Sequence, residues 1–207
     1  MLANVLTFAT LAAASSYPRG QYIDANYDDI AAVPAVPAAT PLGVYKGLNY
    51  TGFAVDEGGV DGAGVVAGVA AHSPPNQIVT GFEQTSLTGA NAGWQVENKA
   101  GSFDLYSFYY GCAVNSVEGA EGVPQQCTFN VRGYRRAADA NPVAQQQFSF
   151  TPKTTAVLAQ AMQATFENSF SNIQRVEVVQ LESTSGEELN VILLDDVVYN
   201  LYSKAQY

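Results

Sequence analysis

The sequence predicts an all-β protein, a two-sheet antiparallel β-sandwich of jelly-roll type with one short helix near residues 155–163. Short runs rich in Val, Phe and Tyr recur from Tyr45 onward, and Gly, Pro, Asn and Asp turn signals separate them. The length of 207 residues suits one domain with its own core, which is usual for all-β sandwiches of this size. The only two cysteines, Cys112 and Cys127, are each flanked by a strand-like run.

The expected strands follow one another along the chain. They are 22–29, 45–55, 65–71, 77–82, 93–97, 103–114, 128–134, 146–151, 174–182 and 189–202. Between the first two, residues 30–43 carry three prolines and should cross the surface, because proline interrupts ladder hydrogen bonds. The helix is expected at 155–163, where Val157, Leu158, Ala161 and Met162 would share one face.

The cysteines predict a disulfide that staples a hairpin of the runs 103–114 and 128–134. Cys127, Phe129 and Val131 alternate with polar residues, so the disulfide should lie on the core side of its strand. Closing a loop of about 15 residues stabilises a fold by roughly 3 kcal/mol in the chain-entropy model. Two reduced core thiols or a two-cysteine metal site are the alternatives. A single histidine, His72, argues against a zinc site of usual composition.

The N-terminal segment indicates export. Residues 1–14 form a short apolar run followed by small residues, as in a signal peptide cleaved after Ala14. Residues 15–21 would then be a lead-in, and 22–207 a single domain. The alternative is that this run is a buried strand or helix of the mature domain. Asn49 begins the only Asn-X-Ser/Thr sequon, and its glycosylation would agree with a secreted or extracellular, cell-wall-associated protein.

The charge balance limits the partners. Nineteen acidic residues stand against nine basic ones, a formal net charge of −10, and such a chain repels phosphate backbones and anionic membrane surfaces. The only local basic cluster is Arg132, Arg135 and Arg136. No segment is long and apolar enough to span a bilayer. We therefore expect a monomer that binds no nucleic acid and has no membrane span.

Several segments, in this order, resemble a large group of secreted fungal proteins, mostly of unknown function. They are Tyr27-Asp28-Asp29, residues 45–53, Ser73-Pro-Pro-Asn76, residues 103–112, the stretch from Val123-Pro to Gly133-Tyr134, and Leu194-Asp-Asp-Val-Val-Tyr199. Members of that group usually carry Phe where this chain has Tyr27. The resemblance implies a jelly-roll sandwich of the galactose-binding or carbohydrate-binding-module type, a secreted protein, and contact with glycans.

The first candidate site is a structural calcium ion. In jelly-roll binding modules the first and last strands often lie together and hold Ca²⁺ between carboxylates and backbone carbonyls. Here Asp28 or Asp29 would face Asp195 or Asp196, and two acidic pairs could supply charge for the six to eight oxygens that calcium requires. The alternative is that these carboxylates end strands in solvent.

The second candidate is a platform for polysaccharide or glycoprotein glycans. Sugar rings stack on aromatic faces, because their C–H groups are apolar while their hydroxyls need polar neighbours. Trp94, Tyr109 and Tyr110 are the proposed glycan-binding residues, with Tyr106, Tyr134, Tyr199 and Tyr202 as further aromatic faces. Trp94 is favoured because Ala-Asn-Ala-Gly-Trp-Gln is expected to be a polar, Gly-containing loop. The alternative is that Trp94 and most of the tyrosines fill the core.

No pattern predicts catalysis. A serine hydrolase would need His72 as its base, but no Gly-X-Ser-X-Gly elbow is present. Glu83, Glu97 and Asp104 could serve a glycosidase, yet no spacing pairs two of them. We therefore expect a secreted, non-catalytic, glycan-binding β-sandwich. The alternatives are a structural cell-wall or effector-like interaction protein without a glycan site, and an unrecognised carbohydrate-active enzyme.

Overall fold

The computed structural model describes residues 20–32, 41–57, 68–81, 91–98, 101–115, 121–153, 158–183 and 190–202. These residues form strands almost throughout, and their only helical element is a single 3₁₀ turn, η1 (Asn168–Phe170). The strands are β1 (Gln21–Ala25), β2 (Pro41–Tyr45), β3 (Leu48–Glu57), β4 (Gly68–Ala70), β5 (Asn76–Gly81), β6 (Ala92–Val96), β7 (Ser102–Asn115), β8 (Glu121–Pro124), β9 (Cys127–Tyr134), β10 (Ala144–Phe150), β11 (Leu158–Gln160), β12 (Met162–Thr165), β13 (Arg175–Ser183) and β14 (Asn190–Tyr202).

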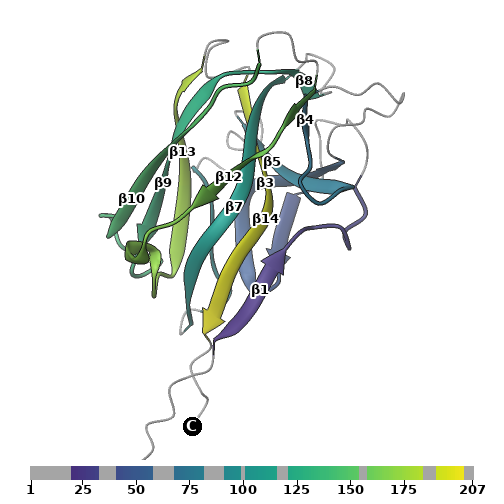
Figure 1. Cartoon of the computed structure of the whole chain (residues 1–207). Helices are drawn as coiled ribbons and strands as arrows, with labels where there is room; N and C mark the ends of the chain where they lie inside the picture. Colours follow the sequence, from purple (N-terminus) through teal and green to yellow (C-terminus); the bar gives the residue numbers. More distant parts are fainter. Residues whose placement is uncertain are drawn as a thin grey trace, which may run out of the picture.

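Twelve of these strands make one antiparallel sheet. Its main path runs β10-β9-β13-β6-β3-β5-β14-β7-β12, with β1 on β14, β2 on β3 and β8 on β7. The remaining two, β4 and β11, pair in parallel as a small separate sheet. The first and last described strands, β1 and β14, lie side by side (Figure 1).

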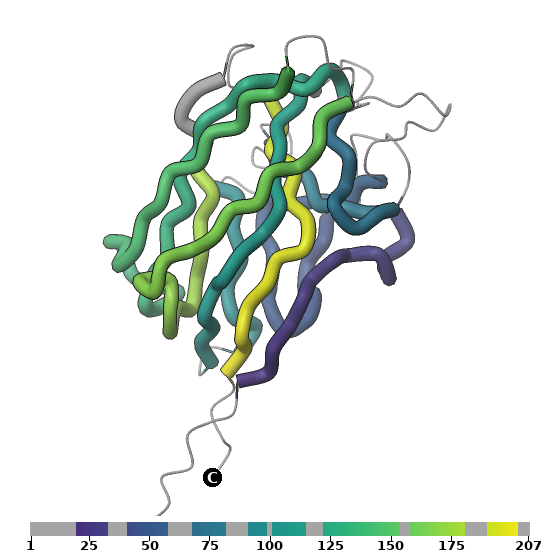
Figure 2. The backbone as a smooth tube through the Cα atoms, viewed as in Figure 1, coloured from purple at the N-terminus to yellow at the C-terminus, as the bar shows by residue number. Residues whose placement is uncertain are grey.

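The sheet is strongly curled: β9, β10 and β13 lie to the left of β7, and β12 runs from the β7 edge toward them (Figures 1 and 2). Two hydrogen bonds join its two ends. The Gln146 side-chain amide of β10 donates to the Thr165 carbonyl of β12 at 2.9 Å, and the Tyr110 hydroxyl of β7 donates to the Ser149 carbonyl of β10 at 3.0 Å. The curl therefore encloses a core between the two halves of one sheet.

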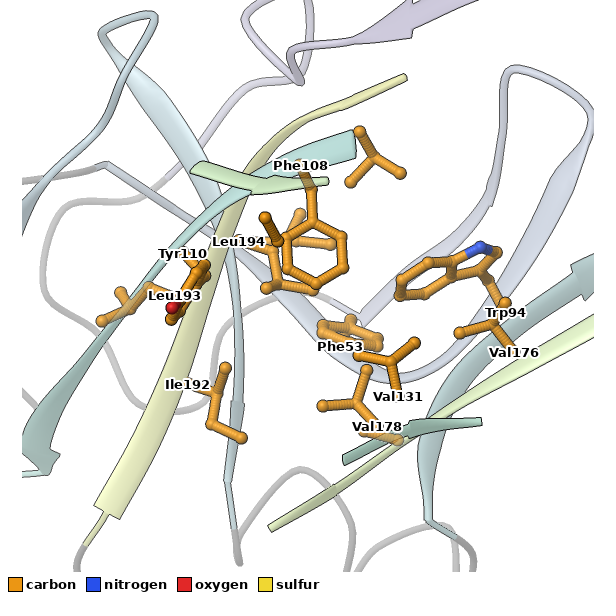
Figure 3. Close-up of a cluster of buried hydrophobic side chains, with 14 of the residues drawn as sticks. Phe53, Trp94, Phe108, Tyr110, Val131, Val176, Val178, Ile192, Leu193 and Leu194 are labelled. Atoms are coloured by element: carbon orange, nitrogen blue, oxygen red, sulfur yellow. The ribbon is translucent and has the colours of Figure 1, made fainter. Parts of the chain in front are cut away.

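Aromatic side chains from both halves fill this core (Figure 3). The Trp94 ring of β6 lies 5.9 Å from Phe53 of β3 and 6.5 Å from Phe108 of β7, centroid to centroid. Phe108 in turn packs at 5.9 Å against Phe148 of β10. Such tilted and edge-on contacts add roughly 1 kcal/mol each to the free energy from area burial, so these rings fix how the two halves meet.

The disulfide between Cys112 and Cys127 is confirmed. Both residues are buried, and Cys127 shares the core face of β9 with Phe129 and Val131, as the alternation predicts. The predicted hairpin is wrong, however. β7 pairs with β14, β12 and β8, whereas β9 pairs with β10 and β13, so the disulfide crosses between two strands that form no ladder together.

The helix predicted at 155–163 is also wrong over its described part. Residues 158–160 form β11, and the chain then enters β12, which pairs with β7. A helix this short has little stability of its own, and the free edges of β4 and β7 offer backbone partners instead. Met162, expected on the buried helix face, is 43% exposed at this edge. Residues 154–157 lie outside the described residues.

Most predicted strands otherwise lie close to their expected positions, but several differ. β1 ends at Ala25 rather than at residue 29, β2 begins inside the segment predicted to cross the surface, and β8 was not predicted. A tight turn at Lys46 and Gly47, both with positive φ, follows Tyr45, so the predicted strand 45–55 begins as β3 only at Leu48. The small-residue run 65–71 is reduced to β4 in the described residues, and its Val69 packs directly onto Gly111 of β7. A Cβ at Gly111 would lie 2.5 Å from Val69 Cγ1, so glycine is required there.

Candidate functional site

The outer face of β12, β7, β14 and β1, the side turned away from the core, presents polar and aromatic side chains in cross-strand rows. Residues paired in register point to the same side of a sheet, so the ladders define the rows. The first row holds Gln163, Tyr109 and Asp195; the second holds Thr165, Ser107, Val198 and Asp24; the third holds Asp104, Asn200 and Tyr22. These four strands lie together at the front of Figure 1.

Two tyrosines are exposed to solvent around the third row, Tyr22 within it and Tyr106 beside it. Tyr22 of β1 is 65% exposed and Tyr106 of β7 is 38% exposed. The Asn200 side-chain amide, in register with Tyr22, donates to the Tyr106 hydroxyl at 2.6 Å. The Tyr202 hydroxyl donates to Asp104 Oδ2 at 2.7 Å. These five residues make a polar-edged aromatic patch, which we call the tyrosine patch.

At the first row, the loop that connects β4 to β5 is hydrogen-bonded to β14 through Ser73. The Ser73 backbone N–H donates to Asp195 Oδ2 at 2.8 Å, and the Ser73 hydroxyl donates to Asp196 Oδ1 at 2.7 Å. Asp195 Oδ1 also accepts the Asp196 backbone N–H at 2.8 Å. Asp196 sits in the left-handed region, with φ of +47°, where the register of β14 shifts. This irregularity lets consecutive carboxylates both reach the loop.

The other end of the same loop is held by the first acidic pair. Asp28 Oδ1 accepts the Asn76 backbone N–H at 3.1 Å, while the buried Asn76 side chain donates to the carbonyls of Tyr27 and Ile30. Asp29 accepts the Tyr45 hydroxyl at 2.6 Å.

The candidate calcium ligands are therefore placed at two ends of one loop. Asp28 binds at Asn76, whereas Asp195 and Asp196 bind at Ser73, each through protein hydrogen bonds. Within the described residues, no group of three or more His, Cys, Asp or Glu side chains could hold a metal ion. In the described structure, Asp28, Asp195 and Asp196 are hydrogen-bond acceptors for residues 73–76.

His72 projects from this loop onto the outer face. Its Nδ1 lies 2.5 Å from Asp196 Oδ2, and its ring stacks on Tyr109 with centroids 3.4 Å apart and planes within 9°. The His72 side chain remains 45% exposed, against 11% for Asp196. Asp196 therefore holds the Nδ1 edge of the imidazole, and Tyr109 covers one of its faces. The other face and the Nε2 edge point away from these two residues.

Burial affects two carboxyl groups around His72. Desolvation raises the pKa of Asp195 to about 7, although the N–H bonds from Ser73 and Asp196 act in the opposite direction. Burial and the charge of Asp196 also raise the pKa of Asp24, while Lys46 and His72 lower it. Asp24 therefore lies close enough to His72 and Asp196 to interact with both electrostatically.

The predicted glycan-binding residues are separated by the structure. Trp94 is 1% exposed and Tyr110 is 4% exposed, and both point into the core (Figure 3), so neither ring can stack on a sugar in solvent. Only Tyr109 lies on the outer face, half-buried under His72. Trp94 was misleading because the stretch interpreted as a polar loop forms strand β6 (Ala92–Val96), from which the tryptophan packs inward.

Sequence reasoning missed Tyr22 and the position of His72. The alternation in β1 could have indicated Tyr22, because Ile23 and Ala25 face the core and leave Tyr22 and Asp24 outside. No local pattern places His72 on β14, since its hydrogen-bond partner Asp196 is 124 residues away in the chain. Of the glycosidase candidates, Asp104 is held by the Asn172 N–H and Tyr202, Glu97 is exposed, and Glu83 lies outside the described residues.

The fold and this face define an all-β protein built from one curled antiparallel sheet, with a mixed polar and aromatic outer surface. The chain belongs to the family of the domain of unknown function DUF7371, whose model matches residues 68–205. No curated protein matches the chain. No helix within the described residues has the length and hydropathy needed to cross a membrane.

Of two similar solved structures, one supports a shared fold. A DUF4465 family protein from Bacteroides caccae ATCC 43185 has a TM-score of 0.52 at 11% identity, covering 86% of this chain and 98% of that one. This likeness concerns the fold alone. The K1 cleaved adhesin domain of Lys-gingipain from Porphyromonas gingivalis W83 has a TM-score of 0.32 at 14% identity, covering 90% and 100%, which is too low to indicate a shared fold.

Proposed function

We propose that this protein is a secreted, non-catalytic glycan-binding protein that uses the tyrosine patch on the outer face of β7, β14 and β1. The observation that carries the proposal is the pair of exposed rings of Tyr22 and Tyr106 around the Asn200 amide. A single exposed aromatic side chain would be ordinary, but apolar surface gathered in a patch with a polar rim is typical of a binding site.

The chemistry of the patch suits a sugar. Aromatic faces stack against the apolar C–H faces of a pyranose, and its hydroxyls require hydrogen-bonding neighbours at the ring edge. Asn200, Asp104 and Tyr202 supply such neighbours, and they are already fixed by hydrogen bonds to one another or to Tyr106. A pre-ordered polar rim lowers the entropy cost of binding.

The remaining features support an extracellular role. The curled sheet, with β1 beside β14, suits a sandwich of jelly-roll type, and the resemblance to secreted fungal proteins supports the same architecture. The disulfide favours an oxidising compartment. Asn49, the proposed glycosylation site, is partly exposed on β3, away from the tyrosine patch, so a glycan there leaves the patch free.

A glycan-array screen with the purified protein tests the proposal. Tyr22→Ala and Tyr106→Ala should each lower affinity for a bound glycan about five- to tenfold, the loss of one stacking contact. Val143→Ala, at another exposed apolar residue on the β9–β10 connection, is the matched control and should change nothing. Binding that survives both tyrosine substitutions would place the site elsewhere. Absence of any glycan binding would favour the structural or effector-like alternative.

A further inference from the structure

We infer that His72 and Asp24 form a second subsite on the same outer face, so that the protein selects neutral oligosaccharides long enough to reach from the tyrosine patch to His72. This inference rests on the proposed function. It adds to that function a ligand class and a requirement for chain length.

The His72 ring is built as a contact surface. Asp196 holds Nδ1, and Tyr109 covers one face of the imidazole, so the ring has little freedom to rotate. The His72 side chain is still 45% exposed with these two partners in place. Among the described residues Nε2 has no hydrogen-bond partner. An ordered ring with a free polar edge offers both stacking and a hydrogen bond to a sugar.

The register of the strands gives the separation between the tyrosine patch and the His72 subsite. His72 lies over the first row, on Tyr109, and Tyr22 stands in the third row, with Asp24 in the row between them. The first and third rows are five residues apart along both strands, from Tyr109 to Asp104 on β7 and from Asp195 to Asn200 on β14. At roughly 3.3 Å per residue, the subsites are about 16 Å apart along the strands. A monosaccharide cannot contact both, whereas an oligosaccharide lying along β1 and β14 can.

The charges on this face favour a neutral ligand. Three carboxylates, those of Asp24, Asp104 and Asp196, lie along the path, in a chain of net charge −10. Lys46 is the cation nearest to Asp24, and its ammonium donates to the Asp24 carbonyl at 2.8 Å. Carboxylates accept strong hydrogen bonds from sugar hydroxyls, but they repel uronate or sulfate groups.

The test is calorimetric titration with monomer-to-hexamer series of cello-, laminari- and chito-oligosaccharides, and with oligogalacturonates as the anionic series. For the neutral series that binds, affinity should rise with length and then reach a plateau. His72→Ala and Asp24→Ala should each lower oligomer affinity about five- to tenfold and leave monomer affinity unchanged. Tyr22→Ala should lower both, and Gln145→Ala, at an exposed residue of β10, should lower neither.

Each outcome has one meaning. Equal affinity for monomer and hexamer, or unchanged oligomer affinity in both His72→Ala and Asp24→Ala, would overturn the second subsite and leave the tyrosine patch standing. Tighter binding of oligogalacturonates than of every neutral series would overturn the neutral class. Absence of binding in all four series would overturn the inference together with the proposed function. Thermal melting of each variant identifies any that has lost its fold, and Asp24, exposed on β1, can be replaced without disturbing the core.

Discussion

Cys112 and Cys127 are covalently joined although their strands, β7 and β9, belong to opposite halves of the curled sheet. Their Cα atoms are 6.2 Å apart, and both side chains face the core. β7 carries Tyr106 and Tyr109 on its outer face, so the disulfide anchors the strand that supplies the centre of the proposed binding surface. The disulfide therefore holds β7 in place from the core side of the sheet, opposite the proposed binding surface.

Removal of this disulfide should lower stability without changing the fold. The closed loop spans a sequence separation of 15 residues, for which the chain-entropy model gives roughly 3 kcal/mol. Urea unfolding of the Cys112→Ala/Cys127→Ala variant should show a loss of that size. Dithiothreitol should destabilise the wild-type protein and leave the variant unchanged, and equal sensitivity of both proteins would contradict the prediction.

The positions of most strands could be predicted because alternation of apolar and polar residues is a local property. In β9 the alternation alone places Cys127, Phe129 and Val131 on the core side, and the structure agrees. Pairing is not local. β9 finds its partners at β10 and at β13, which begins some forty residues later, so proximity in sequence wrongly suggested a hairpin with β7.

The candidate site was predictable only in part, for the same reason. The sequence places Asp28 and Asp195 near one another through adjacent first and last strands, and β1 does pair with β14. In the structure, backbone N–H groups of the 73–76 loop donate to these carboxylates. That contact joins segments far apart in the chain, so the spacing of residues in the sequence could not predict it. Burial of Trp94 likewise depends on Phe53 and Phe108, which come from two other strands.

Asn76 should be the most sensitive polar residue of the loop. Its buried side chain donates at 3.0 Å to the Tyr27 carbonyl and at 2.8 Å to the Ile30 carbonyl. Asn76→Ala leaves two carbonyls without these donors and should cost about 1–3 kcal/mol of unfolding free energy. Urea denaturation checks this value, with Gln145→Ala as a control at an exposed residue. A change within about 0.5 kcal/mol would contradict the prediction.

Asp195 should make the fold less stable as pH rises. Its folded-state pKa of about 7 exceeds the ordinary value of 3.8, so between about pH 4 and 7 the folded state retains a proton that the unfolded state has lost. Stability is therefore highest below this window, falls by up to about 1.4 kcal/mol per pH unit within it, and is level above it as far as this group is concerned.

The Asp195→Asn variant isolates this effect, because asparagine does not titrate. Unfolding free energies measured from pH 4 to 8 should show a more negative slope for the wild-type protein than for the variant. Glu97→Gln, which changes an exposed carboxylate, should keep the wild-type slope. Parallel curves for the wild-type protein and Asp195→Asn would show that the N–H bonds from Ser73 and Asp196 offset the burial.

Thermal stability should not depend on calcium. Asp28 and Asp195 each accept a backbone N–H from the 73–76 loop, and Asp196 is bound by Ser73 and His72, so an ion would have to displace these bonds before it could bind. Calorimetric melting in EDTA and in millimolar calcium should give the same midpoint. A rise with calcium that disappears in Asp28→Asn, but persists in the control Glu97→Gln, would restore a cation site at the junction of β1 and β14.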